Sequence, residues 1–167
     1  MKVITLVGKS NSGKTMTIKT LIYKILVAGG QLNYTKPKHI KNRNFLTKEN
    51  ANLFKEEFEN ELSLEQFKTP PFDLTAKFDY QGKIVLITTA GDSLEYIRSI
   101  YEKNKPCDIF ICASHNSDVM INGLESLGDV TYIPQYRVEK IKDATALNKA
   151  IIERNNFIAS KILNEIK

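Results

Sequence analysis

The sequence is organised around one segment near its start, Val3-Ile4-Thr5-Leu6-Val7-Gly8-Lys9-Ser10-Asn11-Ser12-Gly13-Lys14-Thr15. Its second half fits the spacing G-x-x-x-x-G-K-[ST] from Gly8 to Thr15 without a mismatch. An apolar, largely β-branched run precedes this spacing, and apolar residues follow it at helical intervals, namely Ile18, Leu21, Ile22, Ile25 and Leu26. The segment therefore predicts a strand, a tight loop and a helix in direct succession.

A loop of this kind binds phosphate through its backbone. Gly8 and Gly13 allow dihedral angles and a close approach that a Cβ atom would block, so successive N–H groups can point inward. The helix that follows directs the positive end of its dipole at the same anion. We therefore expect ATP, or another nucleoside triphosphate, to be bound by Gly8, Lys9, Ser10, Asn11, Ser12, Gly13, Lys14 and Thr15.

Two side chains of the loop have expected roles of their own. Lys14 would meet the β- and γ-phosphates as a point charge, which makes it a catalytic candidate. The Thr15 hydroxyl would bind Mg²⁺. The competing interpretation is a strand-to-helix turn rich in Gly and Ser, in which Lys-Thr occurs by chance.

These residues resemble the Walker A motif of the P-loop NTPases, and the resemblance is specific for phosphate binding. The first forty or so residues are also similar to the MobB family, nucleotide-binding proteins associated with molybdopterin guanine dinucleotide synthesis. In that family a P-loop strand and helix lead to a second strand that ends in a Lys-His loop. Here that loop would contain Lys38 and His39. The resemblance implies a shared fold.

Lys9 directly follows the first glycine of the motif. A lysine at this place resembles the signature lysine of the deviant Walker A class, the partition and division-site ATPases. In that class the lysine reaches across a dimer, so the resemblance implies a homodimer or another protein partner. Ser10 and Asn11 stand where that class has glycines, and a solvated lysine on a basic loop is the competing interpretation.

Length and composition predict a single domain over residues 1–167. The chain has 42% hydrophobic residues, 26% charged residues and a net charge of +5. This charge favours anionic ligands but gives no support for nucleic acid as a partner. No apolar run reaches the length of a membrane span and no signal-peptide pattern precedes the first strand, so we expect a cytoplasmic protein.

The two cysteines, Cys107 and Cys112, have neither the spacing of a metal site nor that of a redox motif. We expect both thiols to be reduced.

Hydrophobic periodicity along the chain predicts an α/β fold, a three-layer P-loop NTPase sandwich with a mostly parallel sheet and an antiparallel hairpin. Strands are expected at 31–35, 76–80, 83–87, 108–113 and 129–134, and longer helices at 14–27, 47–67, 93–103 and 143–166. The helix 47–67 falls in a helical insertion at about 44–72, which is interpreted either as a lid over the nucleotide or as a packing helix. Two of these helices are expected to bury an apolar face. In the insertion its residues are Leu53, Phe54, Phe58, Leu62 and Phe67, and in the final helix they are Leu147, Ile151, Ile158, Ile162 and Ile166.

Polar loops follow several of the predicted strands, at the sheet edge where ligands bind in parallel sheets. The basic loop 36–43 would clamp phosphates or a second anionic substrate. His115 would lie near the nucleotide, and the loop 135–142 would offer Tyr136 and Arg137 for base or phosphate contact. A solvated loop or a helix cap is the competing interpretation for each of them.

The strand at 83–87 ends in Thr88-Thr89-Ala90-Gly91-Asp92, which resembles the D-x-x-G turn of GTPases. Thr88 replaces the acid of that turn and no N-K-x-D sequence is present, so guanine selectivity has no support. Asp92 is the nearest carboxylate that could hold a water on Mg²⁺ or orient a nucleophile, which makes it a metal and catalytic candidate. Alternatively, Asp92 caps the next helix and Glu95 completes a capping box.

Three functions are compatible with these features. The first is a Mg²⁺-dependent NTPase that acts as a switch or accessory module, with loops that respond to the γ-phosphate. The second is a small-molecule or nucleotide kinase, in which Asp73 or Asp92 takes the acceptor proton. The third is nucleotide binding without turnover, which the replacement at Thr88 favours.

Overall fold

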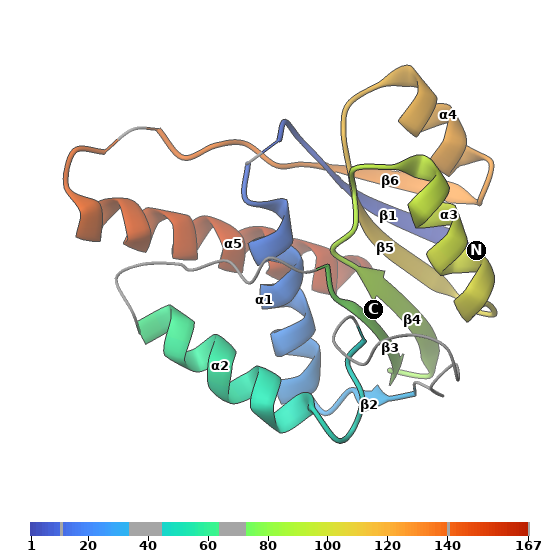
Figure 1. Cartoon of the computed structure of the whole chain (residues 1–167), viewed down its shortest axis with the longest axis horizontal. Helices are drawn as coiled ribbons and strands as arrows, with labels where there is room; N and C mark the ends of the chain where they lie inside the picture. Colours follow the sequence, from blue (N-terminus) through green and yellow to red (C-terminus); the bar gives the residue numbers. More distant parts are fainter. Residues whose placement is uncertain (11, 34–44, 64–72, 140, 167) are drawn as a thin grey trace.

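The computed structural model describes residues 1–10, 12–33, 45–63, 73–139 and 141–166 (Figure 1). The elements in chain order are β1 (Lys2–Val7), α1 (Lys14–Val27), β2 (Gln31–Leu32), α2 (Ala51–Ser63), β3 (Thr75–Tyr80), β4 (Lys83–Thr88), α3 (Leu94–Asn104), β5 (Ile109–Ser114), α4 (Asp118–Glu125), β6 (Asp129–Pro134) and α5 (Ala144–Ile166). The predicted strand, loop and helix at the start of the chain are therefore confirmed, and α1 and β6 have the predicted bounds.

The described strands form a six-stranded sheet in the order β2-β3-β4-β5-β1-β6. Strand β1 pairs in parallel with β5 and with β6, and β4 pairs in parallel with β5. Strand β3 runs antiparallel to both β2 and β4. The predicted α/β class, with a mostly parallel sheet and an antiparallel hairpin, is confirmed at this level. Because β4, β5, β1 and β6 run the same way, the loops at their carboxyl ends meet along one edge of the sheet.

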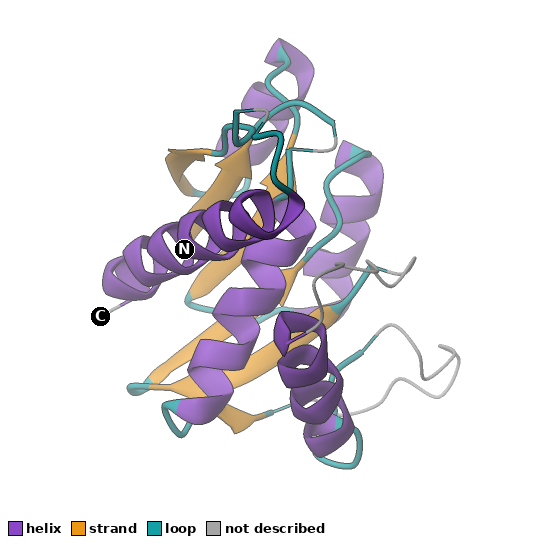
Figure 2. Ribbon diagram, turned by 90° about the vertical axis from the view of Figure 1, so that its left-hand side faces the viewer, coloured by secondary structure: helices purple, strands orange, loops and turns teal. Residues whose placement is uncertain are grey.

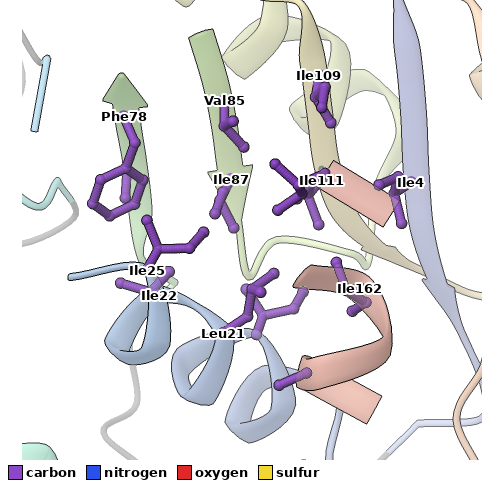
Figure 3. Close-up of a cluster of buried hydrophobic side chains, with 14 of the residues drawn as sticks. Ile4, Leu21, Ile22, Ile25, Phe78, Val85, Ile87, Ile109, Ile111 and Ile162 are labelled. Carbon is purple, nitrogen blue, oxygen red and sulfur yellow. The ribbon is translucent and has the colours of Figure 1, made fainter. Parts of the chain in front are cut away.

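Helices cover both faces of the sheet. In Figures 1 and 2, α1 and α5 lie on one face, while Figure 1 shows α3 and α4 on the other. Beneath α1 and α5 lies a core of aliphatic side chains, several of which are labelled in Figure 3: Ile4, Leu21, Ile22, Ile25, Ile87, Ile111 and Ile162. A second cluster beneath α3 and α4 contains Ile97, Phe110 and Leu124. Strands β1 and β5 are buried on both faces, which explains their nearly continuous apolar sequences.

Two elements differ from the predicted bounds by more than one residue. Strand β2 covers only Gln31–Leu32, since it ends before Asn33, and residues 34–35 of the predicted strand lie outside the described residues. Helix α2 begins at Ala51, four residues later than predicted, because the Asn50 side chain accepts a hydrogen bond from Thr47 N at 2.7 Å and closes a turn there. The basic loop at 36–43 also lies outside the described residues.

Helix α2 packs against α1 through aromatic side chains. Phe58 is buried and stacks on Tyr23 of α1 with 4.9 Å between ring centroids, and the Tyr23 hydroxyl donates to Glu59 at 2.6 Å. The expectation that Leu53 is buried is wrong, because that side chain is 56% exposed on the opposite side of the helix. The side chains of Leu62 and Phe67 lie outside the described residues.

The final helix also departs from its predicted burial at one end. Ile158, Ile162 and Ile166 are buried as expected, whereas Leu147 and Ile151 are only partly covered. The first two turns of α5 extend past the edge of α1, so α1 covers this end of the helix less than the rest (Figure 1). Within the described part of the chain, no helix combines the length and the apolar character needed to cross a bilayer.

Candidate functional site

The loop between β1 and α1 occupies the carboxyl edge of the sheet. Gly13 is the N-cap of α1 and has a left-handed conformation, with φ of 90°, which residues with a Cβ rarely adopt. A Cβ on Gly13 would collide with the Arg154 guanidinium, and one on Gly8 would lie 2.5 Å from the Gln135 carbonyl oxygen. The two glycines are therefore required by close packing within the chain itself.

Lys14 lies over this loop. Its ammonium donates to the carbonyl oxygens of Gly8 at 2.8 Å and Lys9 at 2.9 Å. The residue is 9% exposed, and burial lowers the pKa of its ammonium, an effect that the charge of Asp92 opposes. Among the described residues no carboxylate forms an ion pair with Lys14. Because a buried charge without a counter-ion is costly, the loop holds a cation that an anionic ligand would stabilise.

A cleft of about 690 Å³ opens beside the loop. Most of the predicted site residues line this cleft. They are Ser10, Ser12, Gly13, Lys14, Thr15, Asp73, Asp92 and His115. Gly8 and Lys9 face a different cavity, and Asn11 lies outside the described residues. The carboxyl ends of β4 and β5 supply Asp92 and His115, so the sheet topology places a carboxylate and an imidazole opposite the start of α1.

Asp92 does not cap the following helix, so the capping interpretation is wrong. The N-cap of α3 is Ser93, whose hydroxyl accepts from Tyr96 N at 3.3 Å. The Asp92 side chain is 97% exposed, and its Oδ1 lies 3.1 Å from His115 Nε2. Asp92 is therefore free of a structural role in the helix and is available to a ligand in the cleft.

A second carboxylate reaches the same cleft. Asp73, just before β3, accepts a hydrogen bond at 3.2 Å from the hydroxyl of Thr89, which in turn accepts from Leu74 N at 2.8 Å. Thr88, which stands where the GTPase turn has its acid, is fully buried and hydrogen-bonds to Thr75 at 3.1 Å. The two adjacent threonines thus have different positions, because only Thr89 lines the cleft.

The segment after β6 contacts the Gly8–Thr15 loop through two side chains. Gln135 is buried, and its amide nitrogen donates to the Ser12 carbonyl at 3.2 Å while its amide oxygen lies 3.1 Å from the Thr17 hydroxyl. Arg137 donates to the Ser10 carbonyl at 2.8 Å. The sequence indicated that Arg137 would lie near this loop. It gave no signal for Gln135, because glutamine residues are mostly exposed.

Arg154, in the middle of α5, was not a predicted site residue. Its guanidinium donates to Tyr136 O at 2.9 Å and to Asn155 Oδ1 at 2.8 Å, and the side chain is 8% exposed. Burial lowers its pKa, and no described carboxylate pairs with it. The signal that could have identified it is its position on the apolar face of α5, four residues before Ile158. Two buried cations, Lys14 and Arg154, therefore flank the start of α1.

No protein-family model, curated protein or solved structure matches this chain. The function is therefore inferred from the cleft itself. Among the described residues no three His, Cys, Asp or Glu side chains are grouped as a metal-binding cluster.

Proposed function

We propose that this protein binds a nucleoside triphosphate with Mg²⁺ in the cleft beside the Gly8–Thr15 loop and hydrolyses it, acting in the cytoplasm as a switch or accessory module. One observation carries the proposal. A buried lysine without a counter-ion lies at the positive end of a 14-residue helix, in a loop whose glycines permit inward-facing N–H groups. A polyphosphate is the ligand that uses all three features together.

The residues present fit such a ligand. The Ser12 hydroxyl is buried and has no hydrogen-bond partner among the described residues, so a phosphate oxygen would supply an acceptor for it. The first turn of α1 contains no acidic residue that would repel an anion. The Lys14 ammonium, held by two carbonyl oxygens, is already aligned with the loop and needs only a short movement to reach a phosphate.

Thr15 and Asp92 are the oxygen donors that would hold Mg²⁺ in this cleft, with phosphate oxygens and waters completing its shell. The bound ion would neutralise charge on the phosphates. The Asp92 and His115 pair offers a place for the proton that an attacking water loses. Asp92 keeps the imidazole oriented toward the cleft, as a carboxylate partner does for histidine in many sites.

A kinase is the second candidate, and Asp73 is the observation that favours it. This carboxylate lines the cleft together with Asp92, so one of the two could accept the proton of an acceptor hydroxyl. Binding without turnover is the third candidate, because the residue at the place of the usual acid, Thr88, is buried away from the cleft.

Product analysis separates the three functions. ATP and GTP are incubated with the protein in Mg²⁺ or EDTA, with and without a panel of acceptor molecules. Release of inorganic phosphate without an acceptor supports hydrolysis, and formation of nucleoside diphosphate only with an acceptor supports a kinase. Tight binding with no product supports the third candidate. Absence of any triphosphate binding contradicts the proposal as a whole.

The same samples report base selectivity. Because the N-K-x-D sequence that selects guanine is missing, a clear preference for GTP over ATP is not expected.

A further inference from the structure

A second cavity of about 870 Å³ lies beside the phosphate loop. Its walls come from the ends of β1 and β6, from α4 and from the segment after β6. The volume is in the range of cavities that bind small organic molecules. Thr15 and Asp92, to which the proposed Mg²⁺ chemistry is assigned, line the other cleft, while Tyr136 and Arg137 of the segment expected to contact base or phosphate line this cavity.

The lining of this cavity has a defined chemical character. Val7, Ile121, Tyr132 and Pro134 form an apolar wall, and the basic groups belong to Lys9, Arg137 and His115. No Asp or Glu occurs among the described residues of the lining. The Lys9 side chain is exposed and forms no ion pair with a described residue. Such a cavity favours a ligand that combines an apolar or aromatic body with a negative charge.

The cavity and the phosphate cleft are neighbours. Both are lined by Ser12 and His115, whereas Thr15 and Met16, in the first turn of α1, line the cleft alone. Ser12 is 3% exposed, and within the part of the chain that the structure describes its hydroxyl has no hydrogen-bond partner. His115 lies 3.1 Å from Asp92, which lines the cleft alone. A molecule in the second cavity would therefore contact a histidine that is hydrogen-bonded to a carboxylate of the phosphate cleft.

We propose that this cavity binds a small aromatic anion, such as an aryl carboxylate or an aryl phosphate, as a second ligand separate from the nucleotide. The apolar wall takes the ring, and Lys9 and Arg137 take the charge. Through His115 and Ser12 the second ligand alters events in the phosphate cleft. Binding of the ligand rests on the cavity alone, whereas the coupling rests on the proposed nucleotide function.

The probe for this test is 2-naphthoate, with neutral 2-naphthylmethanol as the uncharged control, measured by titration calorimetry on the full chain. We expect 2-naphthoate to bind at least fivefold more tightly than the alcohol. Tyr132→Ala should weaken its binding about tenfold and Lys9→Gln about fivefold. The matched control is Tyr96→Ala, which removes a tyrosine of similar exposure on α3, outside the cavity, and should leave binding unchanged.

Three results overturn the proposal: no binding of 2-naphthoate, equal binding by Tyr132→Ala and Tyr96→Ala, or equal affinity for acid and alcohol. If Tyr132→Ala does not fold, the test is the shift of the Ile121 methyl resonance when 2-naphthoate is added to the parent chain, and an unmoved resonance overturns the proposal.

The aromatic group in this cavity could instead be the base of the nucleotide, and comparing the binding of ATP with that of tripolyphosphate, which has no base, tests this alternative. If Tyr132→Ala weakens ATP but not tripolyphosphate, the cavity holds the nucleotide base and a separate ligand is excluded. Binding of 2-naphthoate by a chain that binds no triphosphate would contradict the proposed function and the coupling while leaving the second site standing.

Discussion

Asp92 and Ser93 are neighbours in the chain with separate roles in the structure. Ser93 caps α3, and Asp92 lies exposed in the cleft beside His115. The sequence Asp92-Ser93-Leu94-Glu95 is compatible with a cap at either of the first two residues, since both types accept hydrogen bonds at helix starts. The end of β4 and the length of the turn decide which one caps, and neither is visible in local sequence preferences.

Asp92→Asn should therefore lower turnover with almost no change in stability. The substitution removes the charge of the group that hydrogen-bonds to His115 and that would face the proposed Mg²⁺, and we expect turnover to fall at least tenfold. Ser93→Ala should do the opposite, with a loss of about 1 kcal/mol from the missing cap and unchanged turnover. Phosphate release and urea unfolding measure the two effects. A stability loss in Asp92→Asn as large as that in Ser93→Ala would contradict this division of roles.

At the scale of elements, the segment between β6 and α5 supports the phosphate loop from outside it. Gln135→Met keeps the length of the side chain but removes the bonds to Ser12 and Thr17. We expect a loss of about 1–3 kcal/mol in unfolding free energy because the Ser12 carbonyl loses its buried donor, whereas the Thr17 hydroxyl keeps Asn155 and Gly13 as partners. Triphosphate affinity should also fall, by about tenfold, since about 1.4 kcal/mol of loop ordering is then lost.

The matched control for this variant is Gln31→Met. Gln31 is exposed and its amide donates to the Gly29 carbonyl at 3.1 Å, so the same change there should affect neither property measurably. Chemical unfolding and calorimetric titration with ATP are the measurements. Equal triphosphate affinity in Gln135→Met and Gln31→Met would show that the segment does not position the loop.

Helix α2 is a packing element in this structure, since its buried Phe58 stacks on Tyr23 of α1. Phe58→Leu should cost about 1–2 kcal/mol through lost contacts and a small cavity. Triphosphate affinity should stay within twofold, because the contact is eight residues along α1 from Thr15. Thermal unfolding and ATP titration measure both. A large change in affinity at unchanged stability would favour the lid interpretation of this helix instead.

At the scale of the whole molecule, the sequence predicted the elements better than the contacts between them. The ends of α1 and β6 follow from a glycine-rich loop and from apolar runs bounded by polar residues, which are local signals. Strand order, with β5 between β1 and β4, depends on pairing between distant segments and has no local signal. The loop between β1 and α1 was predictable for the same reason as α1, and its binding of phosphate stays a prediction. The bracing by Gln135 and Arg154 was not, because it arises only when β6 and α5 are placed beside the loop.

The thiol at Cys112 gives a prediction for the pH dependence of stability. The side chain is fully buried in β5, and burial raises its pKa from 9.0 to about 12. The folded state therefore keeps the proton at pH values where the unfolded state loses it. The stabilisation is complete below pH 9 and is lost as the pH rises toward 12, at about 1.4 kcal/mol per unit.

Denaturant unfolding of the parent chain and of Cys112→Ala at pH 8 and pH 10.5, under reducing conditions, measures this effect. Other groups titrate in both proteins, so the quantity of interest is the difference between them. The parent should lose about 1–2 kcal/mol more than Cys112→Ala over this interval. Parallel losses in the two proteins would show that the Cys112 thiol ionises equally easily in the folded and unfolded states.

The central claim, that the Gly8–Thr15 loop binds the phosphates of a nucleoside triphosphate, is tested most directly by calorimetric titration of Lys14→Met with ATP and Mg²⁺. The control is Lys24→Met, which removes a lysine from the last turn of the same helix. Methionine fills a similar volume without the charge, so both variants should fold with circular dichroism spectra like that of the parent. We predict that Lys14→Met loses about 2–3 kcal/mol of binding free energy, roughly 30- to 150-fold in affinity, and that Lys24→Met binds like the parent. Parent-like affinity in a folded Lys14→Met variant would contradict the claim.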